Sequence, residues 1–588
     1  MNAVLMNTVP MNGAGMHDLL ITNGTIVDGT GADRFIADIA VKDGMIVSIG
    51  SDLGPAEREI DATGLVVTPG WVDIHTHYDG QLTWDPDLAP SSINGVTSLV
   101  VGNCGVGFAP ARPDQRQYLI ELLEGVEDIP GAALAEGLQW EWESFPEFLD
   151  SLEKREWPVD VGTQVPHAAL RYYVMGDDGA DMDIPADPDQ IATMTMLCEE
   201  AIAAGAMGFT TSRTTAHRTS TGRKIGTLKA STEEVLGIAS ALRNLDRGVI
   251  QLISDAYQSE DDELVENEIE LLRRLAIEVD RPISFTVQQN DDTPTRFREL
   301  LGAIDEWNEA GADAKAQVAI RPIGVLIGLN ASANPLNFSA TYLAMEDLPV
   351  ADRLARLQDS EVRSAILAEH ADARPRSFAK VIHSAYDRMY PMAELPDYEP
   401  TPEHSIAGLA AEQGKPANEV MYDLLVANGG GQLLYIPLMN YANGDLSDVR
   451  EMMTSPNAIF GLSDAGAHCN AISDGSFPTT AITHWTRDRA RGEQIRLEDV
   501  VHRQTQATAE HVGWTDRGVL AVGKIADINV IDHDNLQVAA PHLVADLPAG
   551  GTRLMQEVSG YRATIKRGEL TVIDDELTGA RPGRLQRS

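Results

Sequence analysis

Short apolar runs alternate with amphipathic helical stretches from about residue 70 to residue 510, and this alternation restricts the possible folds more than any other feature of the chain. The pattern is typical of βα units around a parallel sheet. The runs that we predict as strands are Leu65–Ile74, Thr97–Gly102, Val159–Val165, Met207–Thr211, Val249–Ile253, Ile283–Val287, Gln317–Ile323 and Ala458–Leu462. Eight parallel strands predict an α/β fold built on a closed TIM-type (β/α)8 barrel, whose catalytic groups follow the carboxyl ends of the strands.

The two ends of the chain are predicted to form β-structure. Residues 18–69 contain short strands separated by the turn signals Asn23-Gly24 and Asp43-Gly44, which are typical of hairpins. Residues 511–588 show the same pattern of short predicted strands, so we predict that both ends together build one small β-sandwich domain. Residues 1–17 lack the basic and apolar regions of a signal peptide and are predicted to be a flexible tail.

The predicted barrel, residues 70–510, contains two segments that are longer than barrel loops need. They span about 105–158 and 324–457. Insertions of this size near a barrel mouth often build lids or specificity pockets, so we expect both segments to lie close to the site.

Charge and cysteine content exclude several classes of partner. A formal net charge of −44 repels nucleic acid and anionic membranes. No apolar run approaches the roughly 20 residues that span a bilayer. Three cysteines cannot form a disulfide framework and suit a reducing compartment, so we expect a cytoplasmic protein that acts on a small molecule. A homo-oligomer remains an open alternative.

The strongest chemical signal is Asp73-Ile74-His75-Thr76-His77 at the end of the first predicted strand. Histidines at i and i+2 of a strand point to the same face, so both imidazoles can reach one metal ion. A chance pair on a surface loop is the alternative interpretation. The position after the first barrel strand favours metal ligands.

A carboxylate follows the eighth predicted strand in Gly461-Leu462-Ser463-Asp464. A carboxylate at the barrel mouth can contact a metal and take a proton from water, which is the work of a general base. We predict these roles for Asp464. The alternative is an N-cap of the next helix, a common role for aspartate after a strand.

Together these features resemble the amidohydrolase superfamily over nearly the whole chain, and in particular its D-aminoacylase (N-acyl-D-amino-acid deacylase) branch. The resemblance rests on the Pro69-Gly70 to His77 strand, the late Gly-Leu-Ser-Asp, the β-rich ends and Asn103-Cys104-Gly105 after strand two. It implies that Cys104 is a metal ligand, as the equivalent cysteine is in that branch. The alternative is a small buried apolar side chain.

The chain also departs from its branch. D-aminoacylases supply histidine ligands from strands five and six, whereas the corresponding stretches here, 249–255 and 282–289, contain none. We therefore favour one zinc ion held by His75, His77, Cys104 and Asp464, without excluding two. His217 and His468 also follow predicted strands and are candidates for an additional ligand or catalytic residue.

Four further side chains are candidates for substrate binding. The Arg213 guanidinium can bind a substrate carboxylate through two hydrogen bonds. A role on the surface or as a helix cap is an equal alternative. His167 follows the third strand in a stretch similar to the D-aminoacylase branch. Tyr435 and Tyr441 could line an acyl or side-chain pocket, and ordinary packing would explain them equally well.

The sequence therefore predicts a metal-dependent hydrolase of a non-peptide amide, with an N-acyl-(D-)amino acid as substrate. The D-specificity comes only from the resemblance. A cyclic amide or lactone hydrolase that uses the same site is the first alternative, because the metal core does not choose between these substrates. The second is a catalytically silent, amidohydrolase-like binding protein.

Overall fold

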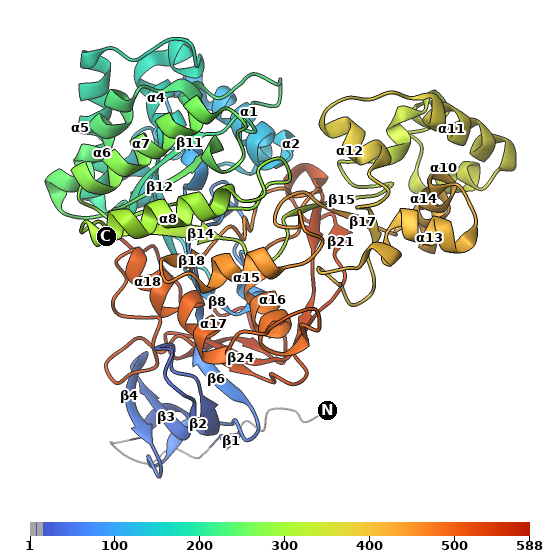
Figure 1. Ribbon diagram of the computed structural model, residues 1–588. Coiled ribbons are helices and arrows are strands. Elements are labelled where there is room, and N and C mark those ends of the chain that lie inside the picture. The colour runs from blue at the N-terminus through green and yellow to red at the C-terminus, as the bar shows by residue number, and fades with distance from the viewer. Residues whose placement is uncertain (1–6, 9–15) are drawn as a thin grey trace.

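The computed structural model describes residues 7–8 and 16–588 and has an α/β fold (Figure 1). Most of the predicted flexible tail, residues 1–17, lies outside the described residues. Within that segment, Asn7–Thr8 forms strand β1 and His17 begins strand β2. Among the described residues, no helix is long and apolar enough to cross a membrane.

The two ends of the chain meet in one ten-stranded sheet at the bottom of Figure 1. Its order is β1-β5-β2-β6-β19-β24-β25-β26, with β3 paired to β2 and β4 to β3. These strands are β1 (Asn7–Thr8), β2 (His17–Ile26), β3 (Phe35–Lys42), β4 (Met45–Gly50), β5 (Ala56–Asp61), β6 (Val66–Pro69), β19 (Ile528–Ile531), β24 (Tyr561–Lys566), β25 (Glu569–Ile573) and β26 (Glu576–Leu577). Buried branched side chains from both ends, such as Ile21 and Val530, share one apolar cluster.

One of the two predicted hairpin turns differs in the structure. Asp43-Gly44 connects β3 to β4, as predicted. Asn23-Gly24 instead lies inside β2, where the pairing with β3 shifts between Ile21 and Gly24. Asn23 has φ +58°. The hairpin prediction at this point was wrong because a β-bulge uses the same positive φ that makes Asn-Gly a turn signal.

The parallel strands form two sheets, β7-β8-β9 and β10-β11-β12-β13-β14-β18. They are β7 (Trp71–Asp73), β8 (Val96–Val101), β9 (Asp160–Thr163), β10 (Val165–Pro166), β11 (Gly208–Arg213), β12 (Val249–Ser254), β13 (Ile283–Thr286), β14 (Ala314–Val318) and β18 (Ala458–Phe460). Gln164 alone separates β9 from β10, and a parallel bridge from Thr76 to Ala465 links the first segment to the last. The strands thus follow one another in the order that a barrel requires.

The bounds of the predicted strands differ from those in the structure, and two cases are the most informative. The run Leu65–Ile74 divides at Pro69-Gly70 into β6, which joins the end sheet, and β7, which joins the parallel strands. The strand predicted at Gln317–Ile323 is β14, which begins at Ala314 and ends at Val318. Pro322 cannot donate a ladder hydrogen bond, so it does not extend that strand.

Helices cover the outside of the parallel strands (Figure 1). They are α4 (His167–Met175), α5 (Pro188–Ala204), α6 (Thr232–Leu245), α7 (Asp262–Glu278), α8 (Arg296–Glu309), α15 (Ser447–Thr454), α16 (Phe477–Thr483), α17 (Leu497–Gln504) and α18 (Gln506–His511). Apolar side chains in or beside the parallel strands form one cluster with residues of and after α18, comprising Val72, Ile74, Val100, Met207, Val249, Ile459, Ala509, Val512 and Trp514. This helix is therefore packed against the strands by apolar contacts.

The two segments predicted as insertions contain mainly helices. The first holds α1 (Arg116–Glu127), α2 (Gly131–Gly137) and α3 (Phe145–Leu152). The second holds β15 (Gly324–Ile327), α9 (Ala340–Leu343), α10 (Val350–Leu357), α11 (Ser360–Asp372), α12 (Phe378–Ser384), β16 (Tyr390–Pro391), α13 (Ile406–Gln413), α14 (Ala417–Val426) and β17 (Leu434–Pro437). Its three strands form an antiparallel sheet of their own, and α10–α14 lie apart from the parallel strands at the right of Figure 1.

Two short antiparallel pairs precede β24. They are β20 (Gln537–Val538) with β23 (Val558–Ser559), and β21 (His542–Val544) with β22 (Arg553–Met555). The division of the chain into the domains predicted above remains a prediction, although β6 ends at Pro69 and β7 begins at Trp71.

A buried ion cluster joins the parallel strands to the C-terminal part of the chain. Asp160, the first residue of β9, has Oδ2 at 2.7 Å from both Arg517 Nη1 and Lys566 Nζ, and at 2.9 Å from Arg567 Nη2. The Asp160 and Lys566 side chains are fully buried. A buried carboxylate needs such partners, so β9 depends on residues from the far end of the sequence.

Candidate metal centre

Three predicted ligands meet just beyond the carboxyl ends of β7 and β8. Ligand atoms of His75, His77 and Cys104 all lie within 4.8 Å of one another, and all three side chains are buried. His75 Nε2 is 3.3 Å from Cys104 Sγ. The cluster forms because β7 and β8 are adjacent parallel strands, so the residues that follow them lie at the same edge.

The turn that carries Cys104 is held close to strands β11 and β12. Cys104 has φ +53°, and its N–H donates to Gln251 Oε1 of β12 at 3.0 Å. A Cβ on Gly105 would lie 2.7 Å from backbone atoms of β11, so only glycine fits there. The Asn-Cys-Gly sequence therefore brings the thiol toward the histidines.

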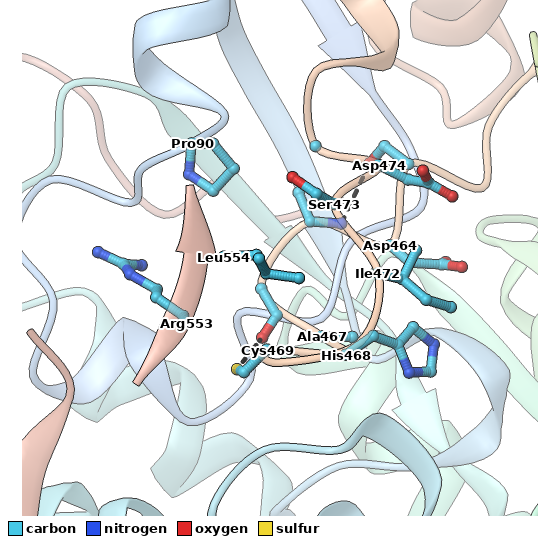
Figure 2. Close-up of a pocket in the computed structure, with 14 residues that line it drawn as sticks. Pro90, Asp464, Ala467, His468, Cys469, Ile472, Ser473, Asp474, Arg553 and Leu554 are labelled. Atoms are coloured by element: carbon cyan, nitrogen blue, oxygen red, sulfur yellow. Dashed lines mark hydrogen bonds between the residues drawn. The ribbon is translucent and has the colours of Figure 1, made fainter. Parts of the chain in front are cut away.

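Asp464 lies beside this cluster. It follows β18, and its Oδ1 is 3.3 Å from His75 Nε2 and 3.6 Å from His77 Nε2. Its side chain is 18% exposed, and it lines a hollow together with His468, Asp474 and Leu554 (Figure 2). The next helix begins only at Phe477, so Asp464 does not cap a helix.

Two residues that sequence reasoning missed contact the histidines from outside the cluster. Glu127 Oε1, at the end of α1, is 3.3 Å from His77 Nδ1. Gln317 Oε1, in β14, is 2.7 Å from His75 Nδ1. Both side chains are almost completely buried. Their signal in the sequence is a polar side chain within an otherwise apolar helix face or strand.

Burial and nearby charges shift the pKa values at the site in different directions. Burial lowers the pKa of His75 to about 4 and raises the pKa of the Cys104 thiol to about 12. For His77, burial lowers the pKa, but the charge of Glu127 and the contact with Asp464 outweigh it and raise the pKa well above its usual value. For Asp464, burial raises the pKa, but the contact with His77 and the charge of His75 hold it well below its usual value.

These residues fit a bound cation. Asp464 Oδ1 is buried and has no hydrogen-bond partner among the described residues. Two imidazoles, a thiol and a carboxylate form a donor set that suits zinc, which binds nitrogen and sulfur ligands in tetrahedral sites. Acidic groups crowd the same buried space, and a positive ion would offset their repulsion.

The two additional histidines lie at different places. His217 Nδ1 is 2.8 Å from Ser212 Oγ and outside the three-residue cluster, and burial lowers its pKa to about 3. His468 lines the same hollow as Asp464, and its Nε2 is 3.9 Å from Glu127 Oε2. Of the two, only His468 lies within 4 Å of a carboxylate that also contacts a predicted ligand.

The structure gives the four candidate substrate-binding side chains other partners. The Arg213 fork pairs with Glu268, with Nη2 to Oε1 at 2.6 Å, and the fully buried His167 contacts Glu234 at 3.0 Å. The Tyr435 hydroxyl donates to the Pro322 carbonyl, and the Tyr441 hydroxyl donates to the Pro400 carbonyl. These contacts explain all four side chains through packing and ion pairing, so the structure does not bring them to the cluster.

Comparisons with known proteins identify the family of the chain. A sequence model of the amidohydrolase family matches residues 58–572. The D-aminoacylase of Alcaligenes xylosoxydans xylosoxydans is 26% identical over 575 residues, covering 97% of each chain, and the N-acyl-D-aspartate deacylase of the same organism is 27% identical over 579 residues, covering 97% of this chain and 94% of that one.

Solved structures show the same fold. A D-aminoacylase described as having a binuclear metal centre superposes with a TM-score of 0.63 at 23% identity, covering 97% of this chain and 100% of that one. An N-acyl-D-glutamate deacylase from Bordetella bronchiseptica, solved with zinc and a phosphonate inhibitor, gives a TM-score of 0.63 at 24% identity with the same coverage.

Proposed function

The chain belongs to the amidohydrolase family, and from this membership we propose that it hydrolyses the amide bond of an N-acyl-(D-)amino acid at the cluster formed by His75, His77, Cys104 and Asp464. It is a metal-dependent hydrolase that acts on carbon–nitrogen bonds other than peptide bonds. The observation that carries the proposal is the convergence of two imidazoles, a thiol and a carboxylate at the carboxyl ends of three parallel strands. The names of the similar deacylases support the substrate class.

The proposal includes a closed barrel. The eight parallel segments, with β9 and β10 counted as one, are linked in order, and the Thr76–Ala465 bridge joins the last to the first. The similar D-aminoacylase and deacylase structures support this fold. The sandwich character of the end sheet, the cytoplasmic location and a homo-oligomeric assembly stay predictions.

One zinc ion fits the described residues better than two. His75, His77, Cys104 and Asp464 would hold it. Gln251 of strand five uses its Oε1 to accept the Cys104 N–H, and its amide nitrogen cannot act as a ligand. The zinc bound to the Bordetella deacylase supports the choice of metal.

The side chains would divide the work of hydrolysis between them. A zinc ion lowers the pKa of water and polarises a carbonyl, which makes the amide carbon easier to attack. Asp464 would take a proton from the attacking water and deliver it to the leaving nitrogen as the carbon–nitrogen bond breaks. Asp464 suits this role because its carboxylate is ionised at neutral pH and faces the hollow. The histidines and Cys104 would fix the geometry.

A second candidate, hydrolysis of a cyclic amide or a lactone, has one specific observation in its favour. The Arg213 guanidinium is committed to Glu268, so it is not free to hold the carboxylate of an acylated amino acid. A cyclic amide carries no such carboxylate and needs no guanidinium.

The test combines metal content with a substrate panel. We expect about one tightly bound zinc per chain and turnover of N-acyl-D-amino acids above N-acyl-L-amino acids, cyclic amides and lactones. His75→Ala and Asp464→Asn should each abolish turnover. Appreciable activity in either variant, or a protein that takes up no metal after supplementation, would contradict the proposal.

A further inference from the structure

We propose that Glu127 and Gln317 are positioning residues that hold the two imidazoles by their Nδ1 atoms, so that His75 and His77 both present Nε2 to Cys104 and Asp464. This inference rests on the proposed metal-dependent function. It assigns a role at the site to Glu127, which lies in the first inserted segment, 105–158, and not on a parallel strand.

The contact between His75 and Gln317 fixes one ring. Gln317 Nε2 donates to Ser284 Oγ at 2.8 Å, which leaves Gln317 Oε1 facing His75 Nδ1 at 2.7 Å. A carbonyl oxygen only accepts, so the proton of a neutral His75 lies on Nδ1. The unprotonated Nε2 then faces Cys104 Sγ and Asp464 Oδ1, each at 3.3 Å.

The contact between His77 and Glu127 fixes the second ring. His77 Nδ1 and Glu127 Oε1 are 3.3 Å apart as an ion-pair contact, and neither atom has a hydrogen-bond partner among the described residues. A carboxylate accepts, so it favours the proton on Nδ1 and leaves Nε2 for a metal. His77 Nε2 is 3.6 Å from the same Asp464 oxygen that contacts His75.

Glu127 is itself held in place from two directions. Helix α1 buries Leu119, Leu122, Leu123 and Val126, so the end of the helix is packed against the main core. The backbone carbonyl of Glu127 accepts a hydrogen bond from the N–H of His468. The side-chain Oε2 of Glu127 lies 3.9 Å from His468 Nε2. The residue therefore connects the loop after Asp464 with the ring of His77.

The two positioning residues would act on the metal through the rings they orient. An imidazole without an acceptor at Nδ1 can rotate and exchange tautomers, and both changes weaken its bond to a metal. Loss of such an acceptor typically lowers metal affinity about 10–100-fold. A residue with a purely structural role would change stability instead and leave the affinity of the folded protein unchanged.

The experiment measures zinc affinity by competition with a chromophoric chelator, using full-length protein. Gln317→Met and Glu127→Met remove the acceptors at nearly constant volume, and we expect each to weaken zinc binding about 10–100-fold. Gln317→Glu and Glu127→Gln restore an acceptor and should recover most of the affinity. Glu124→Met is the matched control, because Glu124 lies in the same helix but bonds only the Gly131 N–H.

A second measurement reports on geometry at the metal. In cobalt-substituted protein, the absorption spectrum should change in both acceptor-deleting variants and match the wild type in Glu124→Met. If a methionine variant fails to fold, Ser284→Ala tests the role of Gln317 instead. It removes only the hydrogen bond that Gln317 makes with Ser284, and we expect it to weaken zinc binding several-fold.

The outcomes separate this inference from the function on which it rests. Wild-type zinc affinity and an unchanged cobalt spectrum in both methionine variants would overturn the positioning roles, provided that His75→Ala loses the metal. If His75→Ala also binds zinc as tightly as the wild type, the proposed metal centre itself fails.

Discussion

The two inserted segments, 105–158 and 324–457, bury their apolar side chains in different cores. The buried side chains of α1–α3 belong to the main core, whereas those of α9–α14 form a separate cluster with strands β15 and β17. The first segment also delivers Glu127 to the site. The comparison shows that the length of an insertion does not reveal its role: what matters is the core into which its apolar face packs.

The part of the second segment that holds α9–α14 is joined to the rest of the protein partly through buried polar contacts, whereas Tyr441, Val449 and Met452 of the same segment belong to the main core. Glu399 pairs with Arg489 at 3.2 Å and with His484 at 3.4 Å. The Arg321 guanidinium lies 3.6 Å from the centre of the Tyr398 ring. We therefore expect α9–α14 to unfold or detach without disturbing the residues around His75 and His77, and the following changes test that expectation.

The largest effect is expected from Phe148→Ala in α3. Phe148 is 2% exposed, and its ring centre is 4.8 Å from that of Trp142. Removing a buried phenylalanine ring should lower the free energy of unfolding by about 3–5 kcal/mol. Because α3 shares the main core, calorimetry should show the main transition shift and zinc release shift with it. Phe378→Ala, at a 52% exposed position of the second segment, is the control and should change little. If Phe148→Ala shifts only a separate unfolding transition and leaves the main one unchanged, α3 does not share the main core.

A smaller and local effect is expected from Leu425→Ala in α14. Leu425 is fully buried in the cluster of the second segment. The change should destabilise that segment by about 2–5 kcal/mol. Hydrogen exchange should speed up in α9–α14, while zinc affinity stays at the wild-type value. Loss of zinc in this variant would show that the two cores unfold together.

The smallest effect is a pH dependence of the attachment. Burial raises the pKa of Glu399, but the contact with His484 and the hydrogen bonds from Arg489 outweigh it and lower the pKa from 4.5 to about 2. The lowered pKa means that this contact stabilises the fold fully above about pH 4.5 and loses its contribution as the pH falls toward 2. Amide protection in α9–α14, corrected for the intrinsic exchange rate at each pH, should fall over that interval. Glu399→Gln should flatten this dependence, and an unchanged profile would rule out Glu399 as the attachment point.

The ligand cluster was predictable from the sequence because its signals are local. His75 and His77 follow an apolar strand within four residues of its end, and Asp464 follows β18 in the same way. Their convergence is a property of parallel strands and needs no knowledge of long-range packing. The structure brings these three residues and Cys104 together, while their roles remain proposals.

The residues around that cluster were not predictable, because each depends on contacts far along the chain. Glu127 lies 50 positions after His77 and follows Leu123 by one helical turn, and its only signal is a charge on an apolar helix face. The partner of Arg213 is Glu268 of α7, which no local pattern identifies. Asn23-Gly24 shows the converse case, since its local signal fits a hairpin turn and a bulge equally well.

The buried cluster around Asp160 has a consequence for the order in which the protein can be completed. Asp160 and Arg517 are separated by 357 residues. At the usual rate of roughly 5–20 residues per second, the ribosome needs on the order of 20–70 s to make that interval. Throughout that time β9 carries a carboxylate whose cationic partners do not yet exist. The parallel strands therefore cannot reach their final packing before Arg517 and Lys566 have been made, and nascent chains that stop before residue 517 are expected to be substrates for chaperones or proteases.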